Sequence, residues 1–115
     1  MTVKLNLKIN QGETFRYKFL WQDIHGIAID MTNYTADMQM RAFVDDAAIL
    51  FELSTTNNRI IITPLTGTIE LYISADDTMT LTWPDGVYDL EVTSPTGDVT
   101  RLIEGKVTTV KNVTR

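Results

Sequence analysis

Residues 15–21 read Phe15-Arg16-Tyr17-Lys18-Phe19-Leu20-Trp21, with an aromatic side chain at every second position. Side chains of a β-strand point alternately to its two faces, so this spacing places the four rings on one face. Leu20 departs from the pattern, because it is apolar and lies on the opposite face. Each ring can bury on the order of 150–250 Å². We therefore expect this face to anchor the core of a β-sheet protein.

The same period of two recurs on both sides of this stretch. Apolar and polar residues alternate over 3–9, 34–43, 49–53, 68–73, 87–93 and 99–110, and an isoleucine-rich strand is expected at 59–63. Glycine, proline, asparagine and aspartate separate these segments, as is typical of turns. We predict one all-β domain over residues 1–115, an antiparallel β-sandwich of about eight strands. The sequence favours an open sandwich but is also compatible with a barrel.

One segment lacks the alternation. Ser74 is followed three residues later by Asp77, a combination that caps a helix and places a carboxylate in its first turn. This pattern predicts a short helical turn near residues 75–81.

The loop at 94–98 predicts how the last two strands pair. It carries an early proline and Gly97, as a hairpin loop with a bulge requires. Its length places Glu91 opposite Arg101, and it also places Leu90 opposite Leu102. Leu102 and Ile103 are adjacent apolar residues that cannot share a face, and Gly105 is the expected position of a further bulge.

Composition argues against several classes of protein. The chain has no cysteine, which excludes disulfides and thiolate metal sites. The net charge is −5 and the ten Lys and Arg residues are dispersed, so we expect no binding of nucleic acid, which usually needs a basic patch. No apolar run approaches the ~20 residues of a membrane span, so no membrane insertion is expected.

Catalytic and metal-binding patterns are also missing. The serines Ser54, Ser74 and Ser94 are interpreted as turn or cap residues, and His25 is the single histidine. The acidic pairs at 45–46 and 76–77 lack the spaced oxygen ligands of a calcium loop. We therefore expect no enzymatic activity, no catalytic, cofactor-binding or metal-binding residues, and no cofactor.

Four residues are candidates for contact with another protein. The loop that begins at Asp23 is unusually apolar, and Ile24, His25 and Ile27 flank its turn. Loops run over the surface, so exposed isoleucines there suggest a contact with a neighbouring protein. The alternative is that they fold back onto the end of the sheet and that His25 is only solvated. Trp83, beside a proline, either closes the helical turn against the sheet or is exposed for contact, for example with a sugar ring.

The order of several short blocks resembles that of a known family. The blocks are Gln11-Gly12-Glu13-Thr14-Phe15, Trp21-Gln22-Asp23-Ile24-His25-Gly26, residues 29–36, Thr66-Gly67-Thr68-Ile69, Leu81-Thr82-Trp83, residues 86–92, Ser94-Pro95-Thr96-Gly97, Val99-Thr100-Arg101-Leu102 and Glu104-Gly105. In these blocks the chain is similar to the small immunoglobulin-like proteins and N-terminal domains of tailed-phage tails, including the N-terminal domain of baseplate upper proteins. The resemblance implies an immunoglobulin-like fold and offers no catalytic residues.

Two functions follow as expectations. The resemblance implies a non-catalytic structural protein of a bacteriophage virion, made in the cytoplasm of the bacterial host. In the tail or baseplate it would dock to other virion proteins, or to further copies of itself as a homo-oligomer. The alternative is a small β-sandwich module that binds a carbohydrate or a receptor. An unpaired sheet edge is a further route to assembly, although the sequence does not indicate which strand lies there.

Overall fold

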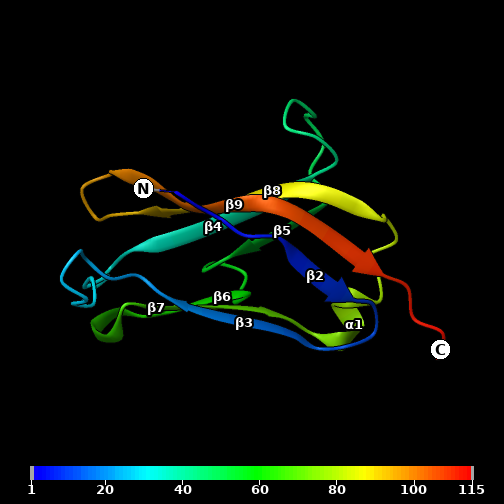
Figure 1. Ribbon diagram of the computed structural model, residues 1–115, viewed down its shortest axis with the longest axis horizontal. Helices are drawn as coiled ribbons and strands as arrows, with labels where there is room; N and C mark the ends of the chain where they lie inside the picture. Colours follow the sequence, from blue (N-terminus) through cyan, green and yellow to red (C-terminus); the bar gives the residue numbers. More distant parts are fainter. Residues whose placement is uncertain (1, 115) are drawn as a thin grey trace.

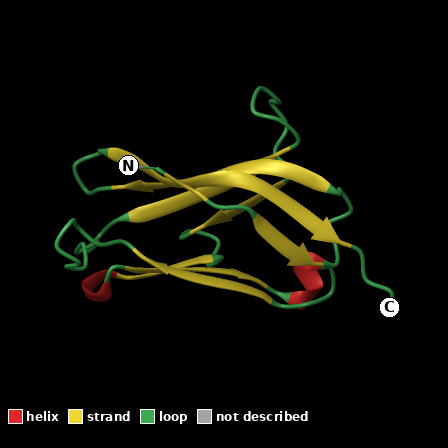
Figure 2. Ribbon diagram, viewed as in Figure 1, coloured by secondary structure: helices red, strands yellow, loops and turns green. Residues whose placement is uncertain are grey.

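Two β-sheets packed face to face form the computed structural model, which describes residues 2–114 (Figures 1 and 2). The strands are β1 (Val3–Lys4), β2 (Leu7–Asn10), β3 (Phe15–Leu20), β4 (Thr35–Arg41), β5 (Phe51–Ser54), β6 (Ile60–Thr63), β7 (Thr68–Ile73), β8 (Asp85–Thr93) and β9 (Val99–Val110). A 3-10 turn spans Pro64–Thr66, and the helix α1 spans Ala75–Thr78. The six-stranded sheet has the order β1-β9-β8-β4-β5, with β2 also paired to β9, and the three-stranded sheet has the order β3-β7-β6. The predicted all-β sandwich is confirmed, and both sheets are open.

The strand pairs are antiparallel except at the N-terminus. β1 and β2 both pair with β9 in parallel, so the beginning and the end of the chain run side by side (Figure 1). Leu5 and Asn6 connect the two short strands. The amide of Leu5 donates to the carbonyl of Glu104, and the Asn6 side chain accepts a hydrogen bond of 3.1 Å from the amide of Lys106. The sequence pattern of β1 and β2 predicted strands but not this parallel direction.

The core is mainly aliphatic and methionine-rich. Its fully buried large side chains come from both sheets and the loop before β4: Ile9, Met31, Met38, Met40, Leu53, Ile60, Ile69, Leu71, Ile73, Leu90, Val92 and Val107. The predicted aromatic face of β3 does turn inward, but Phe15, Phe19 and Trp21 are only half-buried and Tyr17 is 36% exposed. β3 is an edge strand of the narrower sheet, so its rings pack at the margin of the sandwich.

The helix α1 is shorter than the predicted turn at 75–81. Ser74 caps it as expected, because its hydroxyl accepts a hydrogen bond of 3.1 Å from the amide of Asp77. Thr78, the last helical residue, is buried, and its hydroxyl donates to the carbonyl of Glu13 at 2.9 Å. This bond ties α1 to the turn between β2 and β3. Within residues 2–114, no helix combines the length and the apolar character needed to cross a bilayer.

The pairing of β8 with β9 confirms one predicted contact and corrects two others. Glu91 lies opposite Arg101 as expected, but Leu90 pairs with Ile103. Leu102 is therefore the extra residue of a bulge, which lets two consecutive apolar residues of β9 both be buried. The bulge predicted at Gly105 is absent from this strand pair, since Gly105 pairs regularly with Tyr88.

Candidate functional site

The loop that carries Ile24, His25 and Ile27 has a well-defined backbone. One carboxylate oxygen of Asp23 accepts hydrogen bonds from the amides of His25 at 2.8 Å and Ile27 at 3.0 Å. The amide of Asp23 donates in turn to the carbonyl of Ile27 at 2.9 Å. Gly26 adopts a positive φ of 77° that a side chain disfavours. The sequence thus builds a tight turn whose shape is held by a single aspartate.

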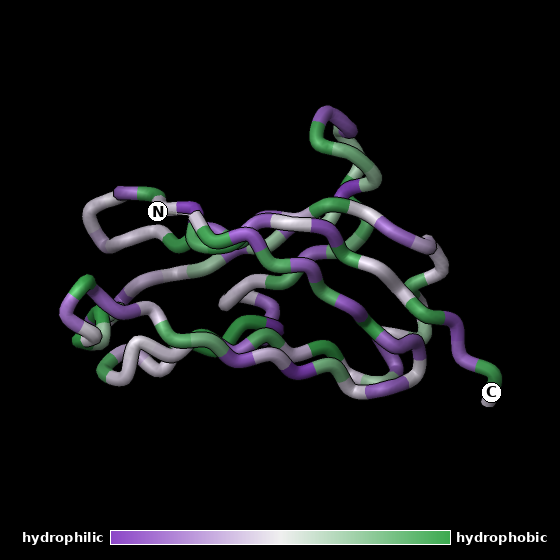
Figure 3. Tube along the Cα trace, viewed as in Figure 1, coloured by the Kyte–Doolittle hydropathy of each residue, from purple (hydrophilic) through white to green (hydrophobic). Residues whose placement is uncertain are grey.

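Both isoleucines of this turn point to solvent. The exposed fraction is 95% for Ile24 and 63% for Ile27, and His25 is exposed as well. They have not folded back onto the sheet. The exposed Leu65 sits on the 3-10 turn between β6 and β7 at the same end of the sandwich (Figures 1 and 3). We call Ile24, Ile27 and Leu65 the end patch.

The two turns of the end patch are joined at their base through Trp21. Its amide donates to the carbonyl of Gly67 at 2.8 Å, and its carbonyl accepts from the amide of Ile29 at 3.0 Å. Further along the same loop, Asp30 accepts bonds from the hydroxyl and the amide of Thr32, and these bonds hold the pKa of Asp30 below its ordinary range. The end patch therefore rests on a hydrogen-bonded base.

Trp83 lies away from the other three candidates. Its segment follows α1, at the opposite end of the sandwich from the loop between β3 and β4 (Figure 1). The indole is half-buried and packs against the core. Its carbonyl accepts a hydrogen bond from the hydroxyl of Thr109, and the carbonyl of Pro84 accepts from the amide of Thr109 at 3.0 Å. The structure thus ties the backbone at Trp83 and Pro84 to β9 and packs the indole against the core.

A second apolar loop, not singled out from the sequence, projects between β4 and β5 (Figure 1). The strand predicted over 34–43 ends at Arg41, whose guanidinium turns back to donate to the carbonyls of Asp46 and Ala47 at 2.9 and 2.8 Å. Phe43 and Val44 are exposed on this loop. In the sequence, Arg41 is an indication of this turn, since the long side chain of an arginine before a turn can donate hydrogen bonds to the carbonyls of that turn.

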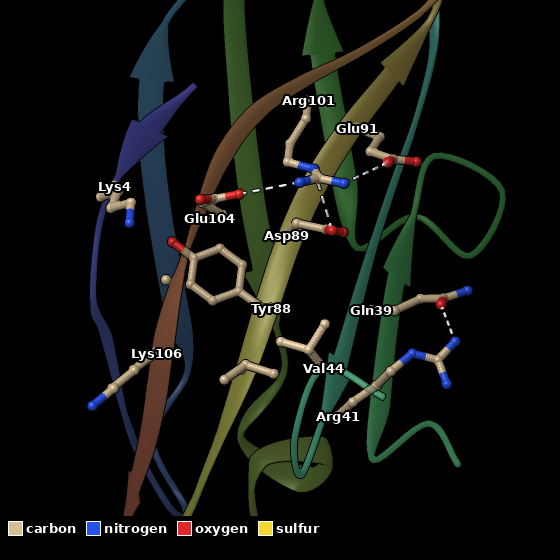
Figure 4. Close-up of a pocket in the computed structure, with 12 residues that line it drawn as sticks. Lys4, Gln39, Arg41, Val44, Tyr88, Asp89, Glu91, Arg101, Glu104 and Lys106 are labelled. Atoms are coloured by element: carbon tan, nitrogen blue, oxygen red, sulfur yellow. Dashed lines mark hydrogen bonds and ion pairs between the residues drawn. The ribbon is translucent and has the colours of Figure 1, made fainter. Parts of the chain in front are cut away.

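A polar groove with a volume of about 470 Å³ crosses the outer face of the larger sheet (Figure 4). At its centre the guanidinium of Arg101 lies 3.4 Å from Asp89, 4.0 Å from Glu91 and 3.2 Å from Glu104. Four charged groups thus neutralise one another in part on the sheet surface. Such exposed pairs contribute about 0–1 kcal/mol each to stability.

An apolar groove of about 260 Å³ opens on the side of the sandwich where β1 faces β3. The two sheets and the bulge of β9 contribute its lining: Val3, Leu5, Tyr17, Phe19, Leu20, Trp21, Leu102 and Ile103. The alternation over residues 15–21 predicts a core position for these rings and therefore does not predict this groove. The missing information was the position of β3 at the edge of its sheet, which alternation alone does not determine.

The acidic pairs have structural partners. Asp77 lies 3.0 Å from the guanidinium of Arg59, and a carboxylate oxygen of Asp46 accepts from the amide of Ala48 at 3.0 Å. Within residues 2–114, no three His, Asp or Glu side chains are grouped closely enough to hold a metal ion.

Neither a protein-family model nor a curated protein matches this chain. A relation to phage tail proteins therefore stays an expectation from the sequence blocks quoted above, and the surfaces of the molecule provide the physical basis for a functional proposal.

Proposed function

We propose that this protein is a non-catalytic structural component of a bacteriophage virion, a tail or baseplate part that docks to other virion proteins through its end patch. The observation that carries the proposal is the exposure of Ile24 and Ile27 on a turn held by Asp23. Burying an isoleucine at an interface contributes about 1.5–3 kcal/mol. Because the backbone of the turn is already ordered, binding loses little conformational entropy there.

A second exposed apolar surface supports a structural role in which the protein contacts more than one other virion protein. The loop with Phe43 and Val44 projects from another part of the molecule, and Arg41 braces it. The resemblance of the sequence blocks to tail proteins points to the same class of function. Fold by itself would not, because one sandwich architecture serves many functions.

The alternative function, binding of a carbohydrate or a receptor, has the polar groove in its favour. Its volume of about 470 Å³ falls within the roughly 300–1,000 Å³ of small-molecule sites. However, within residues 2–114 Tyr88 is the one aromatic residue that lines this groove, and that side chain is buried. A sugar ring bound in this groove would therefore find no exposed aromatic face among these residues to stack on, which favours the structural role.

The proposal is tested first by the genomic neighbourhood and then by co-purification. We expect genes for tail or baseplate parts beside this one, and a complex with at least one of their products. The double variant Ile24→Ser with Ile27→Ser should lose the complex while its melting temperature stays near that of the parent. The matched control is Val113→Ser, which removes another exposed apolar side chain and should leave the complex intact. A complex that survives the double variant, or binding to a glycan array in place of any complex, contradicts the proposal.

A further inference from the structure

The longest continuous free edge among the described strands belongs to β3. This strand has six residues and lies at one end of the order β3-β7-β6, with β7 as its partner. The other edge strands, β1, β2, β5 and β6, have between two and four residues. A free edge presents unpaired backbone donors and acceptors to which an extended segment of another chain can bind.

Two hydrogen bonds indicate which residues of β3 offer these groups. In an antiparallel ladder, alternate residues direct their N–H and C=O groups to the same neighbour. The amide of Trp21 donates to Gly67, in register with β7, and the amide of Tyr72 donates to Arg59, away from β3. Both bonds assign the odd-numbered residues of β3 to the ladder with β7. The residues that direct N–H and C=O to the free edge are therefore Arg16, Lys18 and Leu20.

The apolar groove lies directly beside this edge. Tyr17 and Phe19 of β3 form one wall, and Val3 with the bulged Leu102 contributes to the other. A strand added to β3 would lie about 4.7–4.9 Å away, so its inward side chains would reach the groove. The volume of about 260 Å³ is below that of typical small-molecule sites and suits individual apolar side chains.

The opposite side of the edge is cationic. Arg16 and Lys18 are exposed, and none of the ion pairs within residues 2–114 includes either of them. The Arg16 guanidinium carbon lies 4.6 Å from the ring centroid of Tyr72, and Lys18 pairs in register with Glu70. The outward side chains of an added strand would therefore meet two positive charges.

These charges argue against a second copy of this chain as the occupant. If β3 paired with β3 of a copy in antiparallel fashion, its outward residues would face those of the copy. Centred on Tyr17, that pairing places Arg16 opposite Lys18 in both halves. Like charges directly opposite one another destabilise a strand pair. Charge complementarity favours a segment with acidic residues at the outward positions.

We propose that the β3 edge binds an extended segment of a partner protein in which acidic and apolar residues alternate. The acidic side chains lie against Arg16 and Lys18, the apolar ones enter the apolar groove, and the backbone continues the three-stranded sheet. The inference rests on the proposed function to the extent that the partner is a protein, and it adds a further contact that adjoins the end patch at Trp21.

Binding of short synthetic peptides to the full chain tests this assignment. A fluorescein-labelled peptide that alternates glutamate with valine should bind. Peptides that alternate lysine with valine, or glutamate with serine, should bind about tenfold more weakly or not at all, because one lacks the charge and the other the apolar contact. Equal binding of all three, or no binding of the glutamate–valine peptide, overturns the proposal.

Two sets of variants locate the site. Lys18→Pro removes one free-edge N–H without breaking the ladder to β7, so it should weaken the peptide by about tenfold relative to Lys18→Ala. The double variant Arg16→Glu with Lys18→Glu should reverse the preference, so that the lysine–valine peptide binds more tightly than the glutamate–valine peptide. This second variant keeps the test valid if Lys18→Pro lowers the stability of the fold. Binding unchanged in both, or a dimer of the parent that Lys18→Pro abolishes, refutes this occupant.

Failure here is distinguishable from failure of the proposed function. The peptide assay reads only the β3 edge, whereas the co-purification assay with Ile24→Ser and Ile27→Ser reads only the end patch. Loss of the peptide result with a preserved tail-protein complex rejects the edge and leaves the virion role standing.

Discussion

The phenol of Tyr88 donates a hydrogen bond of 2.6 Å to the carbonyl oxygen of Leu5, 83 residues away in the sequence. A Cβ atom at Gly105 would overlap the same carbonyl. One backbone oxygen thus packs against both β8 and β9 at the point where the chain passes from β1 to β2. Leu5 also lines the apolar groove, so these contacts connect β8 and β9 to the wall of that groove.

Removing the phenol should loosen the N-terminal segment. Tyr88→Phe deletes the bond to Leu5 while keeping the buried ring, and we expect a loss of about 1–2 kcal/mol in the free energy of unfolding. Urea denaturation at neutral pH measures it. Tyr72→Phe is the control, because Tyr72 is half-buried and its ring faces the Arg16 guanidinium. A loss as large in the control as in Tyr88→Phe would show that the bond to Leu5 is not the cause.

The same residue predicts an alkaline sensitivity. Burial, and to a smaller degree the nearby Tyr17, hold the pKa of Tyr88 well above its ordinary value of 10.0. In the unfolded chain the phenol ionises near pH 10, whereas in the folded protein it keeps its proton, so the unfolded state gains stability as pH rises. The contribution of Tyr88 is therefore complete below about pH 10 and is lost progressively as pH rises above that value. The difference between the urea midpoints of the parent and Tyr88→Phe should stay constant from about pH 8 to about pH 9.5 and should shrink by about pH 11. A difference that stays constant over the whole range would contradict this.

Gly105 is required for space. Gly105→Ala places a methyl group against the Leu5 carbonyl, which is backbone and cannot rotate away. Overpacking of this kind costs about 1–3 kcal/mol. Thr108→Ala, an exposed position on the same strand, should change the unfolding free energy by less than about 0.5 kcal/mol. A Gly105→Ala variant as stable as the control would mean that β1 and β2 shift freely.

The sequence predicted the strands because alternation is a local property, and it predicted the pairing of Glu91 with Arg101 because a hairpin loop fixes it. It could not predict that Leu102 is bulged, since either Leu102 or Ile103 satisfies an apolar position opposite Leu90. Nor could it place β3 at an edge. Sheet order arises from contacts between segments far apart in the chain, which leave no mark on the period of either segment.

The edge position changes the expected cost of mutating β3. A half-buried Trp21 loses less on truncation than a buried core residue, so Trp21→Ala should cost less than the 3–5 kcal/mol of a fully buried tryptophan. Met38→Ala, by contrast, empties a fully buried site and should cost about 2–5 kcal/mol. Chemical denaturation ranks the two. Arg16→Ala and Lys18→Ala should each stay within about 0.5 kcal/mol. Equal losses at all four positions would contradict the observed strand faces.

The contact candidates show a similar division. The exposure of Ile24 and Ile27 was predictable because apolar residues in a glycine-containing turn have few places to be buried, and both side chains are exposed. Whether Trp83 joined them depended on the spatial order of the loops, and its segment, which follows α1, lies at the other end of the sandwich. The β3 edge beside the apolar groove emerges only once the two sheets are packed together.

The last prediction separates the shape of the end patch from its side chains. Asp23→Ala leaves Ile24 and Ile27 in place but removes the acceptor of two backbone amides. By analogy with the loss of a helix cap, stability should fall by about 0.5–2 kcal/mol. Because the turn is then mobile, partner binding should weaken by about tenfold, since ordering it on binding now costs free energy. Asp45→Ala, an exposed aspartate in the β4–β5 loop, is the control. Hydrogen exchange at Ile27 should rise only in Asp23→Ala, and unchanged binding despite that rise would show that the end patch acts through its apolar surface alone, whatever the order of its backbone.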